Sequence, residues 1–500
     1  MPDTGAARAP LLDAAALAGP WAGGRGGSRT QTEPGSGRPI AGIGLAATED
    51  VERAALAAVA AQESWARTTC AERALVLREA AAVLAAHSDE VADWVNRETG
   101  GVGAKGAGEV AAAIEELYAG AALAAEPCGE LLPGSAPGQF GYARRVPVGV
   151  VGVITPWNAP LRLAARAVVP ALALGNAVLL KPDEQTAIGG GLVLAAAFAR
   201  AGLPAGLLAV LPGPAEVGEA LVASEHTAVI SFTGSTATGR RIGSIAGGLL
   251  KRAVLELGGN NAFVVLDDAD LPAAVDAALR ASLAHNGQIC MAAGRHLVHQ
   301  DLAEEYTAAL VERLARLRCG DPRVAEVAIG PLINGRQADR VAGIVADSVA
   351  AGAELRLGGR PLDTGPGAGT LTGLYPPTVL TGVRPGMPAF DEEIFGPVIP
   401  VTSFADDEEA VRLARATAYG LSAAIHTADP VRGRAFADRL PTGMAHVNGS
   451  TIDDAPHVPM GGLGLSGNGH RSGGRWNVEA FTFTQWVTVL DRPRAPRKAG

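Results

Sequence analysis

The sequence has 500 residues, with 42 Lys and Arg against 51 Asp and Glu, and its formal charge is −9. A chain of this length forms two or three domains and buries a large core without needing disulfides or a structural metal. The acidic balance argues against nucleic acid or an anionic membrane as a general partner, and four scattered cysteines argue against a zinc or disulfide framework.

The first 20 residues contain no basic start followed by an apolar block, so we expect no secretory signal. No uncharged apolar run has the length and flanks of a membrane-spanning helix. These features predict a cytoplasmic protein in a reducing compartment. Residues 22–37 are rich in Gly, Ser, Arg and Thr, and we expect them to be irregular, with residues 1–30 partly irregular.

From residue 49 to residue 125 apolar residues recur three and four apart, which predicts helices. The pattern then changes. Short β-branched runs at 148–154, 177–181, 207–211 and 228–232 alternate with helical stretches at 187–201 and 215–223. Wholly apolar strands that alternate with helices are typical of a buried parallel sheet with helical crossovers.

A second α/β pattern begins near residue 260. It predicts strands at 262–266 and 397–404, a helix at 302–317 and another helix that ends by 418. Residues 361–373 are typical of a surface loop, and residues 481–490 predict a strand in a small accessory sheet. The fold class expected from these patterns is α/β.

Ligands in parallel α/β sheets bind at the carboxyl ends of the strands. Three polar segments occupy such positions: Thr155-Pro156-Trp157-Asn158, Lys181-Pro182-Asp183-Glu184 and Thr233-Gly234-Ser235. Two Gly-x-Gly-x-x-Gly matches, at 101–106 and 462–467, lack the strand, helix and acidic residue that a dinucleotide loop requires. The sequence contains no phosphate-loop, zinc-protease or α/β-hydrolase motif.

Cys290 is the candidate nucleophile, because Gly287 and Gln288 loosen and polarise the backbone before it. We expect Cys70, Cys128 and Cys319 to be small buried side chains. A free thiol is only slightly ionised at pH 7, so a nucleophilic cysteine needs a base or a positive field. Glu256 ends an apolar strand before a Gly-Gly turn and is the candidate base; the alternative is a carboxylate that caps the turn.

Six segments together resemble the aldehyde dehydrogenase superfamily, in the expected order and over residues 11–489. They are residues 155–160 (TPWNAP), 181–186 (KPDEQT), 232–236 (FTGST), 256–259 (ELGG), 287–290 (GQIC) and 392–397 (EEIFGP). Within the superfamily, residues 255–261, 291–296 and 467–489 look most like bacterial NAD-dependent benzaldehyde and related aryl-aldehyde dehydrogenases.

The resemblance implies oxidation of an aromatic, benzaldehyde-like aldehyde to its carboxylic acid without a metal. Cys290 is implied to form a thiohemiacetal and then a thioester, Asn158 to stabilise the oxyanion with the Cys290 amide, and Glu256 to act as the general base.

The resemblance also implies NAD as cofactor and assigns residues to its binding. These are Thr155, Pro156, Trp157, Lys181, Glu184, Gly213, Phe232, Thr233, Gly234, Ser235, Leu257, Glu393 and Phe395. Glu184 is implied to accept hydrogen bonds from the adenosine ribose and to repel a 2′-phosphate, which favours NAD over NADP; the neighbouring Asp183 adds negative charge.

Three parts are implied for the fold. Residues 1–135 and 150–258 are expected to form a dinucleotide-binding domain, residues 259–465 a catalytic domain, and residues 136–149 and 478–495 a β arm for oligomerisation. The expected partners are a small aldehyde and further copies of the chain, as a homodimer or homotetramer, because a lone arm leaves strand edges unpaired.

The sequence departs from relatives at Asn260 and Gly464, where many carry Lys, and at Ala167, where some carry a proton-relaying Lys. Arg166 cannot deliver a proton, so the proton route from Glu256 stays open. Ala159 and Ala284 stand where aliphatic-aldehyde enzymes carry aromatic residues, which is compatible with a ring-shaped substrate.

Alternatives remain at this point. An aliphatic aldehyde or a semialdehyde could be the substrate, and Arg162, Arg166 and Arg295 could hold the carboxylate of a semialdehyde. A redox-silent cysteine hydrolase or a binding protein on the same fold is a different class, which NAD-dependent turnover would distinguish.

Overall fold

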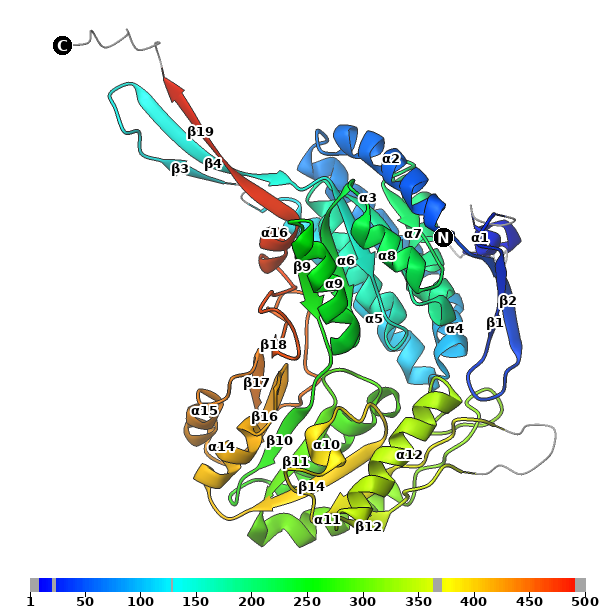
Figure 1. The fold of residues 1–500 in the computed structure, drawn as a ribbon, viewed down its shortest axis with the longest axis vertical. Coiled ribbons are helices and arrows are strands. Elements are labelled where there is room, and N and C mark those ends of the chain that lie inside the picture. Colours follow the sequence, from blue (N-terminus) through cyan, green and yellow to red (C-terminus); the bar gives the residue numbers. More distant parts are fainter. Residues whose placement is uncertain (1–8, 20–23, 127–128, 363–370, 491–500) are drawn as a thin grey trace, which may run out of the picture.

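Two bodies of helices and strands, joined beside a projecting ribbon of strands, make up the chain in Figure 1. This computed structural model describes residues 9–19, 24–126, 129–362 and 371–490. Each body is built on a largely parallel sheet, which confirms the predicted α/β class.

The first body contains a five-stranded, wholly parallel sheet in the order β7-β6-β5-β8-β9. Its strands are β5 (Val150–Ile154), β6 (Ala177–Lys181), β7 (Leu208–Val210), β8 (Thr227–Thr233) and β9 (Arg252–Glu256). The predicted apolar runs match these strands, because a sheet covered by helices buries both faces of each strand.

The helices of this body occupy the predicted helical segments. They pack with the sheet around one hydrophobic core. They are α2 (Thr48–Trp65), α3 (Cys70–Ala86), α4 (Ser88–Thr99), α5 (Gly103–Leu123), α6 (Pro160–Ala173), η1 (Glu184–Thr186), η2 (Ile188–Leu192), α7 (Val193–Arg200), α8 (Ala215–Ala223) and α9 (Thr236–Gly248). The short helix α1 (Ala14–Ala18) contacts η2, which lies far from it in the sequence.

The second body contains a seven-stranded sheet in the order β12-β13-β14-β11-β10-β16-β17, parallel except for the β12–β13 pair. Its strands are β10 (Asn261–Val265), β11 (Ala293–His299), β12 (Glu354–Leu357), β13 (Thr378–Thr381), β14 (Val398–Phe404), β16 (Ser422–His426) and β17 (Met444–Val447). Its helical segments are α10 (Leu271–Leu283), η3 (Ala284–Gly287), α11 (Gln300–Leu314), α12 (Gly335–Ala350), α13 (Pro388–Asp391), α14 (Asp407–Arg415) and α15 (Pro430–Ala437).

The predicted irregular segment at 22–37 is wrong in part, because it contains a strand. β1 (Ser28–Thr32) and β2 (Pro39–Gly44) form an antiparallel hairpin. Its polar residues are retained by pairing: Gln31 donates to Glu98 and to the Glu184 carbonyl, and Glu33 accepts from Arg38 and Arg97. Because hydrogen-bond partners allow these polar groups to be buried, the polar composition of residues 22–37 did not indicate that the segment contains a strand.

The projecting ribbon in Figure 1 is a three-stranded antiparallel sheet in the order β19-β4-β3. Its strands are β3 (Gly129–Leu132), β4 (Gln139–Pro147) and β19 (Thr482–Leu490), which follows α16 (Trp476–Phe481). It carries exposed apolar side chains on Leu131, Phe140, Phe483 and Trp486. The smaller pair β15 (Tyr419–Gly420) and β18 (Leu463–Gly464) lies beside the second body.

Among the described residues, no helix combines the length and apolar character needed to cross a membrane. Cys70 is exposed at the start of α3 and Cys319 is half-buried, so the prediction of buried cysteines is wrong for Cys70. Cys128 lies outside the described residues, as do Pro127 and much of the loop expected at 361–373.

Candidate active site

Cys290 follows a tight bend between α10 and β11. Three consecutive residues, His285, Asn286 and Gly287, have positive φ angles of 48°, 57° and 72°. Such angles are costly for His and Asn, and they persist where surrounding contacts fix them. The Asn286 amide supplies such contacts, because it donates to the Gly330 and Pro331 carbonyls and accepts from the Gly330 amide.

The backbone of Cys290 is held from the neighbouring strand β10. The side-chain amide of Asn261 donates to the carbonyls of Cys290 and Ala292, both at 2.8 Å. A Cβ at Gly259 would lie 2.4 Å from the Cys290 carbonyl oxygen, so only glycine permits this approach. The thiol is thus placed by rigid elements on both sides.

Asn158 lies in the loop between β5 and α6. Its Nδ2 donates to the carbonyl of Gln288, two residues before Cys290, at 2.9 Å. An amide nitrogen carries two hydrogens, so one remains for a second acceptor. Asn158 and Cys290 line the same cavity of about 320 Å³, in which a substrate oxygen can meet both.

Burial raises the pKa of the Cys290 thiol to about 12, and the charges of Glu393 and Glu256 add to this effect. The thiol is therefore neutral at pH 7. Attack on a carbonyl requires that a base take its proton or that a positive charge be placed nearby.

Glu256 ends β9, as predicted, and its carbonyl accepts from the Gly234 amide at 3.0 Å. Both oxygens of its carboxylate are buried and have no hydrogen-bond partner among the described residues. Burial raises its pKa to about 8, against the opposing charges of Arg166 and Arg471. A carboxylate with this pKa can accept and release a proton near neutral pH.

A second, small cavity of about 20 Å³ lies beside Glu256. It is lined by Leu163, Arg166, Ala167, Ser231, Thr233, Glu256, Met460, Ser472 and Phe481. This volume fits one water molecule, and serine and threonine hydroxyls supply partners for it. Leu163 and Thr233 also line the Cys290 cavity, so the two spaces adjoin.

Arg166 belongs to a buried ion cluster. It binds Glu116 at 2.9 Å and Asp454 at 2.6 Å, and Asp454 also accepts from Arg162 at 2.8 Å. Arg295 lies elsewhere, where it donates to the carbonyls of three residues: Asn260, Leu413 and Ala414. The three arginines thus do not converge as a carboxylate clamp.

Aromatic rings form one wall of the Cys290 cavity. Trp157 meets Phe395 edge-on at 5.5 Å between ring centroids, and it meets His285 at 6.5 Å. Phe395 has a positive φ of 57°, and its carbonyl accepts from Gln337 at 2.8 Å. The N-terminal turn of α12 therefore fixes Phe395 against Trp157.

Glu393 lies directly on the Gly258–Gly259 turn. Its Oε1 accepts from the Gly259 amide at 2.9 Å, and a Cβ at Gly258 would approach Glu393 Oε2 to 2.1 Å. Burial raises the Glu393 pKa to about 7, while the Gly259 amide and Arg340 oppose this shift. The two glycines predicted as a turn thus also make room for this carboxylate.

An adjoining cavity of about 320 Å³ lies at the carboxyl ends of β5, β6 and β8, between α8 and α9. It shares Pro156, Trp157, Thr233, Gly234 and Ser235 with the Cys290 cavity. The remaining lining is Ile154, Thr155, Lys181, Asp183, Ala215, Gly218, Glu219, Val222, Phe232, Thr238, Arg241, Ile242 and Ile245.

The cavity between α8 and α9 suits a dinucleotide. Thr155 Oγ1 is buried and lacks a hydrogen-bond partner among the described residues. Lys181 lines the cavity and forms no ion pair with any described residue. Ser235 caps α9, whose N-terminal amides are a favourable site for phosphate oxygens. The residues present therefore fit a bound nucleotide cofactor.

Most residues predicted for the site line either the Cys290 cavity or the cavity between α8 and α9. Leu257 lines the Cys290 cavity. Two do not reach a cavity wall. Glu184 instead pairs with Arg29 at 2.7 Å, and Gly213 packs near Val217 and the Ala46 carbonyl. Ser231 and Ser472, which line the cavity beside Glu256, were not predicted as site residues, and Arg166 was considered only as a ligand for a semialdehyde carboxylate. No local pattern in the sequence reports which buried side chains surround Glu256.

The departures from relatives have local explanations. Asn260 donates to the Phe390 carbonyl at 2.7 Å, a neutral contact inside the protein. Gly464 has φ of 62°, and a Cβ there would lie 2.4 Å from the Ala418 carbonyl oxygen, so a side chain does not fit.

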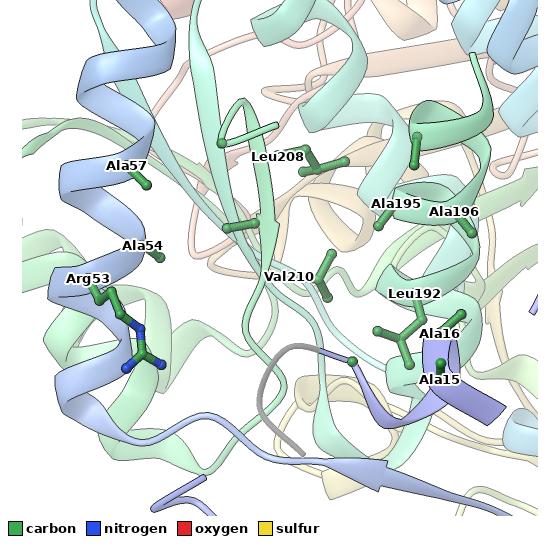
Figure 2. A pocket seen from close by; sticks show the side chains of 14 residues that line it. Ala15, Ala16, Arg53, Ala54, Ala57, Leu192, Ala195, Ala196, Leu208 and Val210 are labelled. Carbon is green, nitrogen blue, oxygen red and sulfur yellow. The ribbon is translucent and has the colours of Figure 1, made fainter. Parts of the chain in front are cut away.

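A larger hollow of about 680 Å³ lies on the other side of β7, away from these residues. Figure 2 shows it between Arg53, Ala54 and Ala57 on one side and Leu192, Ala195 and Ala196 on the other. The described residues that line it are mostly alanine, and the one charged side chain among them, Arg53, binds Asp50 at 2.5 Å. None of these described lining residues could act as a nucleophile or base.

Comparison with known proteins gives a consistent result. Residues 21–487 match the model of the family described as Aldehyde dehydrogenase family. The chain is 49% identical over 472 residues to vanillin dehydrogenase of an Amycolatopsis species, covering 94% of this chain and 95% of the relative. It is 48% identical to benzaldehyde dehydrogenase [NAD(+)] of Pseudomonas putida, covering 95% of each chain.

Solved structures agree. A betaine aldehyde dehydrogenase of Staphylococcus aureus in complex with NAD+ superposes with a TM-score of 0.90 at 29% identity, covering 94% of this chain and 93% of that chain. A succinate-semialdehyde dehydrogenase of Burkholderia pseudomallei gives 0.88 at 34% identity, covering 93% and 94%. These matches confirm the resemblance carried by the six motifs.

Proposed function

Because this chain belongs to the aldehyde dehydrogenase family, we propose that it oxidises an aromatic aldehyde to the carboxylic acid with NAD+ as acceptor. The observation that carries the reaction is the meeting of Cys290 and Asn158 in one cavity, with the partnerless Glu256 carboxylate beside it. The aromatic substrate is supported by the vanillin and benzaldehyde dehydrogenases among its relatives.

In the first step the Cys290 thiol gives its proton to water, which a positive charge placed nearby would favour, and Sγ bonds to the aldehyde carbon as the carbonyl double bond opens, which gives a thiohemiacetal. The oxygen gains negative charge and accepts from the free Asn158 amide hydrogen and the Cys290 amide. Losing one such donor typically lowers the rate by about 10²–10³. The bend at 285–287 positions the Cys290 amide, and the hydrogen bond to the Gln288 carbonyl positions the Asn158 amide, before the substrate arrives.

The thiohemiacetal then becomes a thioester, and bound NAD+ supplies the acceptor for the hydride that this change releases. The residues that would hold the cofactor are Thr155, Lys181 and Ser235, with Glu393 and Phe395 toward its reactive end.

In the last step Glu256 takes a proton from water while that water attacks the thioester carbon, and the carboxylic acid leaves as the Cys290 thiolate re-forms. The cavity beside Glu256 has room for a water that takes up the proton afterwards. This route replaces a lysine relay, since Ala167 carries no titratable group.

A semialdehyde is the less favoured substrate, because Arg162 and Arg166 are bound to Asp454 and Arg295 to backbone carbonyls. We also propose a cytoplasmic homodimer or homotetramer, in which the β3–β4–β19 sheet covers its exposed apolar side chains against another copy.

The test is NADH formation with benzaldehyde, vanillin, succinic semialdehyde and hexanal, each with NAD+ and NADP+, and with Cys290→Ala as the blank. We expect turnover of the two benzaldehydes well above the others, with NAD+, and none in the variant. A preference for hexanal or succinic semialdehyde would overturn the aromatic assignment alone. Hydrolysis without NAD+ would favour a redox-silent cysteine hydrolase.

A further inference from the structure

The segment between β17 and α16 brings a basic residue, Arg471, close to Glu256. Glu256, at the end of β9, forms an antiparallel bridge with Gly467 of this segment. Met460 and Ser472 exchange two backbone hydrogen bonds, at 2.9 and 2.8 Å. Arg471 directly precedes Ser472, so paired backbone fixes its position beside β9.

Gly461 separates the side chains of Glu256 and Arg471. A Cβ at Gly461 would lie 2.9 Å from Glu256 Oε1 and 3.0 Å from Arg471 Nη1. The two atoms are therefore no further apart than the sum of these distances, although they do not form a direct ion pair. The same Cβ would approach the His470 carbonyl oxygen to 2.3 Å, so only glycine leaves the space between carboxylate and guanidinium open.

Backbone carbonyls hold the Arg471 guanidinium. Its Nη1 donates to the His470 carbonyl at 3.0 Å and to the Gly462 carbonyl at 3.4 Å. In the part of the chain that the structure describes, no carboxylate lies close enough to form an ion pair with it. The side chain is half-buried, so solvent screens its charge only in part. Arg471 therefore keeps a positive charge that can act on Glu256.

The other charged groups near Glu256 largely balance one another. Arg166 lies 2.9 Å from Glu116 and 2.6 Å from Asp454. The charge of Asp454 raises the pKa of Glu256, whereas the charges of Arg166 and Arg471 lower it against the larger effect of burial. Because two acids already compensate Arg166, Arg471 supplies the uncompensated positive charge among these described groups.

Two further titratable groups of this region are uncharged at pH 7. Burial raises the pKa of the Cys290 thiol to about 12. Burial also lowers the pKa of His470, and the charges of Arg252 and Arg471 add to this effect. Neither group compensates the guanidinium of Arg471 near neutral pH.

A general base must return to its charged form in every turnover, and Glu256 has no hydrogen-bond donor of its own among the described residues. An opposite charge within about 4–6 Å favours a charged carboxylate, and Arg471 lies within this range. We propose that Arg471 is the positioning residue of Glu256, and that its guanidinium stabilises and orients the ionised carboxylate after the proton has passed to water.

Arg471 carries no proton itself, because a guanidinium stays protonated. It supplies from the C-terminal segment the positive charge that Ala167 cannot supply from α6. This inference rests on the proposed function, in which Glu256 is the base of deacylation.

The test is the pH dependence of kcat for benzaldehyde in Arg471→Gln, with the single-turnover burst of NADH measured in parallel. Without the cation Glu256 should release its proton less readily, so we expect the midpoint of the rise in kcat to move up by about one pH unit. At pH 7 kcat should fall about tenfold, and the loss should diminish toward pH 10. The burst should be unchanged. Arg471→Lys keeps the charge, and its midpoint should lie closer to that of the parent protein.

Arg475→Gln is the matched control, because it removes the same charge from an exposed side chain that stacks on Trp476. We expect it to keep the midpoint of the parent protein. Infrared difference spectra against Glu256→Gln, from pH 6 to pH 10, follow the protonated Glu256 carboxyl without aldehyde or NAD+ and should show the same shift in Arg471→Gln. Thermal unfolding reports whether each variant folds, and Arg471→Met, which keeps the aliphatic stem, replaces Arg471→Gln if that variant does not.

The inference is overturned if the infrared midpoint of Glu256 is the same in Arg471→Gln and in the parent protein, even where kcat falls. It is also overturned if Arg475→Gln moves the midpoint as far as Arg471→Gln does. A parent protein that shows the infrared midpoint but no NAD+-dependent turnover of aldehydes would instead refute the proposed function, so the two failures are distinguished.

Discussion

The pKa of Glu256 predicts how the turnover rate depends on pH. A carboxyl with a pKa of about 8 is roughly 9% ionised at pH 7 and roughly 91% ionised at pH 9. If deacylation limits turnover, kcat should rise about tenfold over this interval. The rise follows from burial of the carboxyl without hydrogen-bond partners.

The assay is steady-state kcat for benzaldehyde from pH 6 to pH 10, with the single-turnover burst of NADH measured in parallel. The Glu256→Gln variant should show a burst but very slow turnover with no rise near pH 8. A parent profile that is flat between pH 7 and pH 9, or a variant with the same rise, would refute the assignment of Glu256 as the base.

The same carboxyl affects stability. Its pKa lies above the ordinary 4.5 in the folded state, so between about pH 4.5 and pH 8 the folded protein holds a proton that the unfolded chain has lost. The free energy of unfolding should therefore fall as pH rises through this window, by up to roughly 1.4 kcal/mol per pH unit. Urea unfolding should show that Glu256→Gln lacks this contribution.

Four further outcomes are expected. Asn158→Ala should lower kcat by about 10²–10³ in steady-state assays, and a loss under tenfold would exclude it as an oxyanion donor. Iodoacetamide at pH 7 should alkylate exposed Cys70 before Cys290 in the empty protein, because burial keeps Cys290 protonated; peptide mass spectrometry would show the reverse order if this is wrong. Arg166→Met should destabilise the fold by about 3–5 kcal/mol in urea, since Glu116 loses its ion-pair partner and Asp454 keeps only Arg162, and an unchanged midpoint would contradict the buried cluster. Trp486→Glu, at a side chain that is 68% exposed on β19, should shift the mass measured by light scattering toward the monomer, unless the arm has no part in assembly.

Much of the fold can be predicted from hydrophobic patterns that are visible in this single sequence. Strands β5, β6 and β8 are mostly apolar, and a polar residue ends or directly follows each of them, so both their existence and their ligand-binding ends were predictable. The β1–β2 hairpin was not, because Gln31 and Glu33 are buried by pairing with residues far away in the sequence. Composition carries no information about such partners.

The site divides in the same way. Cys290, Glu256 and Asn158 each lie in a short local motif; Cys290 and Asn158 line one cavity, and Glu256 lines the small cavity that adjoins it. The surroundings of Glu256 were not predictable, because Arg166 and Ser472 reach it from α6 and from the segment before α16. Likewise, the pairing of Glu184 with Arg29 joins residues 155 positions apart.

The central claim is that Cys290 carries the acyl group of the substrate as a thioester. The most direct measurement is intact and peptide mass spectrometry of Glu256→Gln after mixing with benzaldehyde and NAD+, with Cys290→Ala in the Glu256→Gln background as control. We predict one added benzoyl group, located on the peptide that contains Cys290, and none in the control. NADH formation without that adduct, or a benzoyl group on another residue, would contradict the account.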